Sequence, residues 1–252
     1  MFDPRLVPPS APVTLRPMVN PRPVVKVVPL FDGHQVVIVD NFLAEPETMV
    51  EYAALQRGEF LDSPGNYYPG PELPLTGRFV SSVQEAFLLH ARAPLKARRV
   101  LGIACRLSLA TRRPEQLLPG QRMPHRDSYN LEPMEGVGAM VLYLFKDERL
   151  GGTSFFKPKL PPAEINALLR ELRRMEQAGE SPVPTKPPTF AIASDDHFEK
   201  MLTVQPKFNR AIFYNGQVFH SGHLAAPELL ADDPIAGRLT VNAFFKLRMA
   251  AS

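Results

Sequence analysis

Cysteine and tryptophan are almost absent from this sequence: there is one cysteine, Cys105, and no tryptophan. A single thiol excludes an intramolecular disulfide framework and any cysteine-based zinc ribbon, and it suits a reducing compartment. No stretch approaches the roughly 18 uncharged apolar residues that a membrane span needs. The N-terminus lacks an apolar core between a basic start and a cleavage site, so we expect no signal peptide. These absences predict a soluble, cytoplasmic protein with no membrane association.

Glycine is also scarce beside proline, with 15 glycines against 28 prolines in 252 residues. So much proline excludes an all-helical bundle and favours short strands, many turns and extended loops. The apolar fraction of 44% is enough for a real core. The sequence therefore predicts a β-rich globular chain.

Positive charge is unevenly distributed, although the formal net charge is only +3. No acidic residue lies between Glu85 and Glu115, a stretch that holds seven basic residues (Arg92, Lys96, Arg98, Arg99, Arg106, Arg112 and Arg113). This run is either a solvated basic face or a surface that meets phosphates or another anionic ligand. It lacks interleaved aromatic residues and a helix-turn-helix pattern, so there is no clear nucleic-acid signature.

Helices are expected first along the chain and strands afterwards. Hydrophobic periodicity and capping residues predict helices at about 45–56, 80–93 and 162–178. Apolar runs predict strands at 35–39, 102–110, 138–145, 153–156, 210–214 and 238–246. Residues 58–77 are predicted as a long loop because they hold four prolines and four glycines.

We expect one domain, residues 31–252, preceded by a proline-rich extended arm at 1–30. Within the domain, an insertion of about 45 residues lies between two predicted strands, and long insertions of this kind are usually functional or mobile. This insertion, at about 160–205, combines an amphipathic helix with a proline-rich stretch, so it is a candidate lid.

Three of the six histidines lie where chemistry can be expected. In His125-Arg126-Asp127, an extended backbone would aim the imidazole and the carboxylate to one face. Far downstream, Phe219-His220-Ser221-Gly222-His223 offers a third ligand, with His220 favoured over His223. Two histidines and one carboxylate on one face of a metal ion leave positions open, as non-haem Fe(II) oxygenases require. The alternative is that these histidines are turn or core residues with a purely structural role.

Further motifs follow in a fixed order after His125 and Asp127. A buried strand holds Tyr143, and Gly151-Gly152-Thr153-Ser154-Phe155 follows it. After the second histidine comes Gly237-Arg238-Leu239-Thr240. Arg238 and Thr240 share one face of a strand, an arrangement suited to a salt bridge and a hydroxyl hydrogen bond with a carboxylate.

This order of motifs resembles the Fe(II)/2-oxoglutarate-dependent dioxygenases, in particular the prolyl-4-hydroxylase-like branch, over roughly residues 35–247. The resemblance implies a mainly β fold with α-helices: a double-stranded β-helix, or jelly roll, with supporting N-terminal helices. It implies His125, Asp127 and His220 as iron ligands. It also implies Arg238, assisted by Thr240, as the partner of the far carboxylate of 2-oxoglutarate. Tyr143 could bind the same cosubstrate or be a packed core residue.

The activity implied is hydroxylation of an unactivated C–H bond with release of succinate and CO₂. The cofactors implied are Fe(II), 2-oxoglutarate and O₂, with ascorbate as a reductant. This sequence departs from the family pattern in the eighteen-residue step from His220 to Arg238, where residues 225–235 form an inserted loop.

The substrate is expected to be an amino acid, a peptide or a small metabolite. Candidate substrate walls are Asn66–Gly70, the 160–205 insertion and three arginines, Arg112, Arg113 and Arg122. Two alternatives stay open: a cupin-like metal enzyme that does not use 2-oxoglutarate, and a non-catalytic jelly-roll protein that binds an anionic ligand. The oligomeric state is not readable from the sequence.

Overall fold

The computed structural model describes residues 18–62, 68–127, 131–179 and 188–250. The strands are β1 (Val24–Pro29), β2 (Gln35–Asp40), β3 (Glu72–Leu75), β4 (Ala97–Ala110), β5 (Glu135–Tyr143), β6 (Thr153–Pro158), β7 (Phe198–Val204), β8 (Arg210–Asn215), β9 (Phe219–Gly222) and β10 (Arg238–Met249). The α-helices are α1 (Pro46–Leu55), α2 (Arg78–Ala86), which the π-helical turn η2 (Phe87–Ala91) continues, and α3 (Pro162–Gln177).

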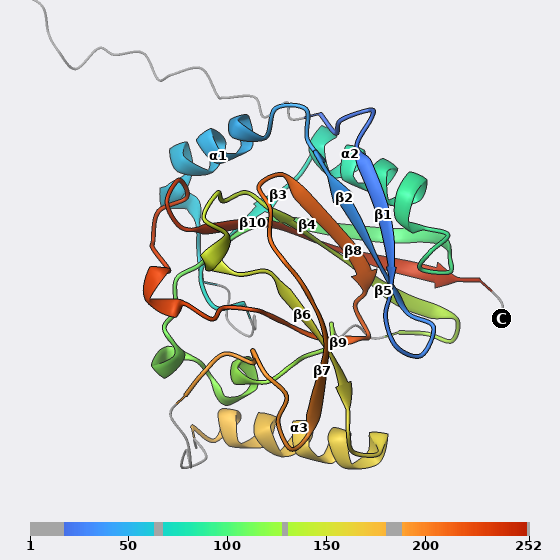
Figure 1. Ribbon diagram of the computed structural model, residues 1–252, viewed down its shortest axis with the longest axis vertical. Coiled ribbons are helices and arrows are strands. Elements are labelled where there is room, and N and C mark those ends of the chain that lie inside the picture. Colours follow the sequence, from blue (N-terminus) through green and yellow to red (C-terminus); the bar gives the residue numbers. More distant parts are fainter. Residues whose placement is uncertain (1–17, 63–67, 128–130, 180–187, 251–252) are drawn as a thin grey trace, which may run out of the picture.

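The strands form two antiparallel sheets. The larger has the order β1-β2-β8-β5-β10-β4-β3, and the smaller has the order β7-β6-β9. From β5 onward the chain passes between the sheets, with β6, β7 and β9 in the smaller sheet and β8 and β10 in the larger (Figure 1). This is the predicted mainly β fold, a double-stranded β-helix.

Three apolar clusters hold the layers together. Met49 of α1 and Phe79 and Val83 of α2 pack against the larger sheet, so the N-terminal helices support it as predicted. A second cluster fills the space between the sheets, and a third, which includes Ile165 of α3, lies against the smaller sheet. Figure 1 shows α3 beside β7, on the side of the molecule away from α1 and α2. Burial of these apolar faces is the main force that fixes the layers.

The six predicted strands and three predicted helices are all present, but the structure adds four strands. Residues 24–29 of the predicted arm form β1, which pairs along its whole length with β2. Residues 72–75 of the predicted 58–77 loop form β3, which pairs with β4. β7 lies inside the 160–205 insertion, and β9 carries His220. The remainder of the arm, residues 1–17, lies outside the described residues.

No helix in the described part of the chain is long and apolar enough to cross a membrane. Cys105 is buried and free, as expected for a small apolar residue, and burial raises the pKa of its thiol to about 12. The cytoplasmic location stays a prediction.

Candidate metal centre and its cavity

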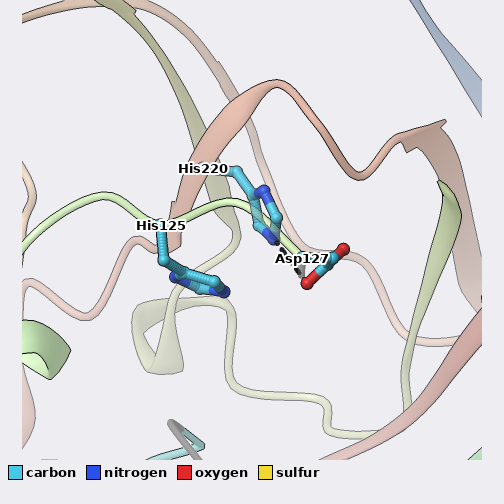
Figure 2. Close-up of side chains that lie close together, drawn as sticks. All are labelled: His125, Asp127 and His220. Atoms are coloured by element: carbon cyan, nitrogen blue, oxygen red, sulfur yellow. Dashed lines mark ion pairs between the residues drawn. The ribbon is translucent and has the colours of Figure 1, made fainter. Parts of the chain in front are cut away.

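Three side chains predicted as ligands meet at one point. The ligand atoms of His125, Asp127 and His220 all lie within 4.8 Å of one another. The Nε2 atom of His220 is 3.8 Å from Oδ1 of Asp127, and Figure 2 shows the two imidazoles and the carboxylate converging. We call these three residues the triad.

Backbone pairing brings the triad together. His125 and His220 exchange two hydrogen bonds of 2.9 Å, from His125 N–H to His220 O and from His220 N–H to His125 O. Two residues on, the Asp127 N–H donates to the Gly216 carbonyl over 2.8 Å. The segment that holds His125 and Asp127 is therefore extended along β9 and the β8–β9 turn, as the sequence predicted.

Gly216 makes room for the carboxylate. A Cβ atom at this position would lie 2.5 Å from Asp127 Oδ2 and 3.1 Å from Asp127 Cβ. Contacts this short are repulsive, so a side chain at residue 216 would displace Asp127. The sequence offered a signal, Asn215-Gly216 directly after a strand, but a turn glycine does not reveal which side chain lies above it.

The hydrogen bonding of His220 fixes its tautomer. Its Nδ1 atom lies 2.9 Å from the carbonyl oxygen of Val218. A carbonyl only accepts hydrogen bonds, so Nδ1 carries the hydrogen and the lone pair of the neutral ring is on Nε2. The nitrogen that faces Asp127 is thus the one that can bind a metal ion.

His223 has a different environment. Its Nδ1 atom lies 2.9 Å from the Ser154 hydroxyl, and the residue is not part of the triad. The geometry therefore favours His220 over His223, in agreement with the sequence-based preference.

Burial sets the protonation of the triad. It lowers the pKa of His125 to about 4, with the charge of His220 acting in the same direction, and it lowers the pKa of His220 to about 4. Burial raises the pKa of Asp127 to about 6, against the opposing charges of His125 and Arg106. At neutral pH the imidazoles are therefore neutral and the carboxylate is ionised, which is the state that metal ligation needs.

One oxygen of Asp127 is unsatisfied. Asp127 is only 9% exposed, and its Oδ2 is buried with no hydrogen-bond partner among the described residues. An unpaired buried carboxylate oxygen is costly, and native proteins reserve such atoms for ligands or function. Two nitrogens and this carboxylate are a donor set that suits Fe(II), so the residues present fit the implied metal.

A cavity of about 430 Å³ opens beside the triad, lined by His125 and Asp127 among others. Leu169 and Leu172 of α3 form part of its wall, so the helix of the 160–205 insertion lies against the site. Of the loop predicted as a substrate wall, Tyr68 and Pro69 line the cavity, whereas Asn66 and Tyr67 lie outside the described residues.

The three arginines predicted as substrate walls are placed elsewhere. Arg112, Arg113 and Arg122 are absent from the described cavity lining; Arg112 pairs with Asp62, and Arg113 donates to the Pro227 carbonyl. The cavity lining therefore does not support these three arginines as substrate walls. Arg106, from the same basic run, lines the cavity instead.

Arg238 is buried, at 3% exposure, and lines the cavity. Its Nε and Nη2 atoms donate to the carbonyls of Gly151 and Gly152, each over 3.1 Å. These two bonds hold the guanidinium in place at the start of β6.

Two tyrosines lie near Arg238. The Tyr68 hydroxyl is 3.4 Å from Thr240 Oγ1; burial raises its pKa, while Arg238 and Thr240 lower it. Tyr143, opposite Thr240 in the sheet, is fully buried, and its hydroxyl lies 2.8 Å from Thr153 Oγ1. Tyr143 is not among the cavity-lining residues, so its role with a cosubstrate stays a prediction. Tyr68, which the sequence did not single out beside Tyr143, does line the cavity.

Comparison with known families decides the relationship of the chain. A family model described as a family of unknown function, DUF6445, matches residues 21–245. The chain belongs to this family. A search of proteins with curated functions found no match to this DUF6445 chain.

Several solved structures are similar to this DUF6445 protein. A prolyl-4-hydroxylase from Pseudomonas putida has 13% identity and a TM-score of 0.44, over 85% of this chain and 94% of that one. HygX from Streptomyces hygroscopicus, with nickel and 2-oxoglutarate bound, has 14% identity and a TM-score of 0.46, over 86% and 84%. EvdO2 from Micromonospora carbonacea var. aurantiaca, complexed with 2-oxoglutarate, has 11% identity and a TM-score of 0.42, over 92% and 96%.

Proposed function

We propose that this protein is a non-haem Fe(II)- and 2-oxoglutarate-dependent oxygenase that hydroxylates an unactivated C–H bond of a small-molecule or peptide substrate. The observation that carries the proposal is the triad itself. Two neutral imidazoles and one buried carboxylate with an unsatisfied oxygen converge beside a cavity. When bound, Fe(II) with 2-oxoglutarate and O₂ would supply the oxidation, with release of succinate and CO₂.

His125, Asp127 and His220 would hold the metal and leave its remaining positions open to the cavity. The hydrogen bond from His220 Nδ1–H to Val218 orients the ring, and the backbone bonds at His125 and Asp127 fix the other two ligands. Such orientation before binding means that little conformational entropy is lost when the ion enters.

Arg238 would bind the far carboxylate of 2-oxoglutarate. It is a buried cation on the cavity wall, and the hydroxyls of Tyr68 and Thr240 lie beside it. A guanidinium has five N–H donors, so its bonds to Gly151 and Gly152 leave others for a ligand. Apolar residues on the wall, such as Phe190 and Leu224, would exclude water from the reaction.

The test is succinate release from 2-oxoglutarate in the presence of Fe(II) and ascorbate, without any prime substrate. We expect slow turnover by the wild type, background release by Asp127→Ala, and loss of 2-oxoglutarate saturation in Arg238→Ala. Arg149→Ala is the matched control, because the side chain of Arg149 is 72% exposed and pairs with the neighbouring Asp147. Anaerobic Fe(II) binding that His220→Ala and Asp127→Ala leave undiminished would overturn the metal assignment.

The same assay addresses the alternative in which the protein is a metal enzyme that does not use 2-oxoglutarate. Two donors of Arg238 already bond to backbone carbonyls, which is also the arrangement of a purely structural arginine. Metal binding that depends on the triad, together with no binding of 2-oxoglutarate, would favour that alternative.

A further inference from the structure

The cavity wall carries a second guanidinium, that of the half-buried Arg106 on β4. Arg106 lies opposite Asn242 in the β4–β10 register, whereas Arg238 lies opposite Ala110. These two positions on β10 are four residues apart, or roughly 13 Å along the strand. The two arginines thus start from well-separated parts of the sheet. Arg238 bonds to Gly151 and Gly152 just before β6, while Arg106 bonds to Glu72 of β3.

Side chains from three neighbouring strands hold Arg106 in position. Its Nη1 atom donates to Glu72 Oε2 over 2.9 Å, and its guanidinium carbon lies 5.1 Å from the ring centre of Phe244. The Ser108 hydroxyl donates to the other oxygen of Glu72 over 2.7 Å, and the Asn242 amide donates to Ser108 over 2.9 Å. Four polar groups on the inner face of the larger sheet therefore form one connected network.

The network places a charged pair at the cavity wall. The side chain of Glu72 is 5% exposed and that of Arg106 is 29% exposed, so a nearly buried carboxylate faces a cation that reaches the cavity. Removing an ion pair from water costs free energy that the mutual attraction often does not return. Yet Arg106, Glu72, Asn242 and Phe244 all line the cavity, where a ligand can use them.

Glu72 does not use all the N–H donors of the Arg106 guanidinium. Within the part of the chain that the structure describes, its only hydrogen-bond acceptor is Glu72. The planar guanidinium can direct its other N–H groups at two oxygens of one ligand group, which is the geometry that carboxylates and phosphates offer.

The charge of the wall favours an anion. Four guanidiniums, those of Arg106, Arg126, Arg173 and Arg238, line the cavity, against two carboxylates, those of Glu72 and Asp127. A divalent metal ion and dianionic 2-oxoglutarate would cancel each other's charge. The excess of positive charge would then remain for the substrate.

We propose that Arg106 binds an anionic group, a carboxylate or a phosphate, of the prime substrate, and that Glu72 and Phe244 position its guanidinium. This inference rests on the proposed function, in which Arg238 takes the cosubstrate and leaves Arg106 for the substrate. Arg106 is then a specificity-determining residue, because a neutral substrate that covers the guanidinium would leave its remaining donors without an acceptor.

The test measures binding of matched acidic and neutral probes to protein loaded with Zn(II) and 2-oxoglutarate, by ligand-observed NMR. The probes are 3-phenylpropionate and its carboxamide, and phenyl phosphate and phenol. Arg106→Gln alone would remove the cation that the buried Glu72 carboxylate bonds to, so the variant used is Arg106→Gln/Glu72→Gln, which removes both charges. Arg99→Gln is the control, since Arg99 is exposed on the same strand.

We expect at least one acidic probe to bind the wild type and Arg99→Gln alike, and to bind the double variant at least tenfold more weakly. The neutral probes should bind weakly and equally to all three proteins. The acid that loses affinity shows whether the site prefers a carboxylate or a phosphate. Equal binding of the acids to wild type and double variant, or no binding of either acid to the wild type, overturns the proposal.

Binding of 2-oxoglutarate in the same samples separates this inference from the proposed function. If the double variant keeps its 2-oxoglutarate affinity and loses the acidic probe, both proposals stand. If the wild type binds no 2-oxoglutarate, the proposed function fails. The acidic probes are then measured on the metal-free protein, where dependence on Arg106 still decides the anion site.

Discussion

At the scale of single residues, the ligands of the candidate metal centre could be predicted from the sequence. The groups that hold those ligands in position could not. His125, Asp127 and His220 could be selected because imidazole and carboxylate are what an open metal site needs. Gly216 and the Val218 carbonyl could not be selected in this way. Gly216 makes room for Asp127, and the Val218 carbonyl orients His220, only after β8 and β9 have turned back on each other. Arg106 was visible only as one member of a basic run, because its contact with Glu72 depends on a strand that the sequence did not predict.

The first prediction concerns the buried charge of Asp127. Burial raises its pKa from the ordinary value of 3.8 to about 6, so ionising it in the metal-free protein costs about 2–3 kcal/mol of stability at pH 7. We therefore expect Asp127→Asn to stabilise the metal-free protein at pH 7 while it abolishes metal binding. Denaturant unfolding of the metal-free proteins at several pH values checks this.

The control is the pH dependence of the stability difference between Asp127→Asn and the wild type. The folded-state pKa of Asp127 is the higher one, so the protonated carboxyl contributes stability that is complete below pH 3.8 and is lost as the pH rises through 6. The advantage of Asp127→Asn should thus be largest at pH 7–8 and should shrink toward pH 4. An advantage that is independent of pH would mean that the charge of Asp127 is not its cause.

The second prediction tests the room that Gly216 leaves for the carboxylate. Gly216→Ala should lower the affinity for Fe(II) by about 10–100-fold, because the new Cβ would fall 2.5 Å from Asp127 Oδ2. Gly102→Ala in β4 is the matched control, since a Cβ there meets nothing within 4 Å. Titration of each protein with Fe(II) under anaerobic conditions measures the effect; equal affinities would show that Asp127 accommodates the methyl group without moving.

At the scale of elements, the strands that the sequence did not predict lie at sheet edges. β1 and β3 are the two edges of the larger sheet, and β7 is an edge of the smaller one. Proline argues against a central strand but is tolerated at an edge, which is why Pro29 and Pro74 fit in β1 and β3. β9 has only four residues, including His220 and Gly222, so it lacks a strand-like apolar alternation. The other strands were predictable because each is an apolar run of ordinary length.

The third prediction concerns the docking of α3. Ile165 is its buried residue and packs in one cluster with Phe156, Phe198 and Phe219 of the smaller sheet. Ile165→Ala should cost about 2–4 kcal/mol and should loosen α3 more than the larger sheet. Hydrogen exchange followed by mass spectrometry should show faster exchange in α3 and unchanged exchange in β5 and β10.

The exposed neighbour Arg170 on α3 provides the control, because Arg170→Ala removes a side chain that is not part of that cluster. Since Leu169 and Leu172 of the same helix line the cavity, Ile165→Ala should also weaken binding of acidic probes. Uniform acceleration of exchange across all strands would instead make α3 an integral part of the global fold, and would remove the basis for considering the insertion as a lid.

At the scale of the whole molecule, the double-stranded β-helix joins distant parts of the chain into one cavity. His125 precedes β5, His220 lies in β9, Arg238 begins β10 and Leu169 belongs to α3, yet all four regions meet at the same cavity. The order of motifs along the sequence predicted the fold and the triad. The 160–205 insertion was also predicted as a candidate substrate wall, and its helix α3 lines the cavity through Leu169 and Leu172. Which residues of that helix face the cavity was not predicted, because an amphipathic pattern shows which face is apolar but not what that face covers.

The last prediction follows from this assembly and uses the stability of the whole protein as its readout. A ligand that binds only the folded state stabilises it by about 2.7 kcal/mol at a concentration of 100 Kd, which for 150–250 residues raises Tm by about 5–10 °C. We expect Zn(II) to raise Tm and 2-oxoglutarate to raise it further.

In Arg238→Met the Zn(II) increment should remain and the 2-oxoglutarate increment should vanish, because Arg238 is the buried cation on the cavity wall and lies outside the triad. In Asp127→Asn both increments should vanish, since in the proposed function the cosubstrate would bind through the metal. Succinate, which keeps a carboxylate for Arg238 but lacks the keto oxygen for the metal, should give a smaller increment than 2-oxoglutarate in the wild type. If 2-oxoglutarate stabilises Asp127→Asn as strongly as the wild type, it binds at another site, and Arg238 is then a structural arginine.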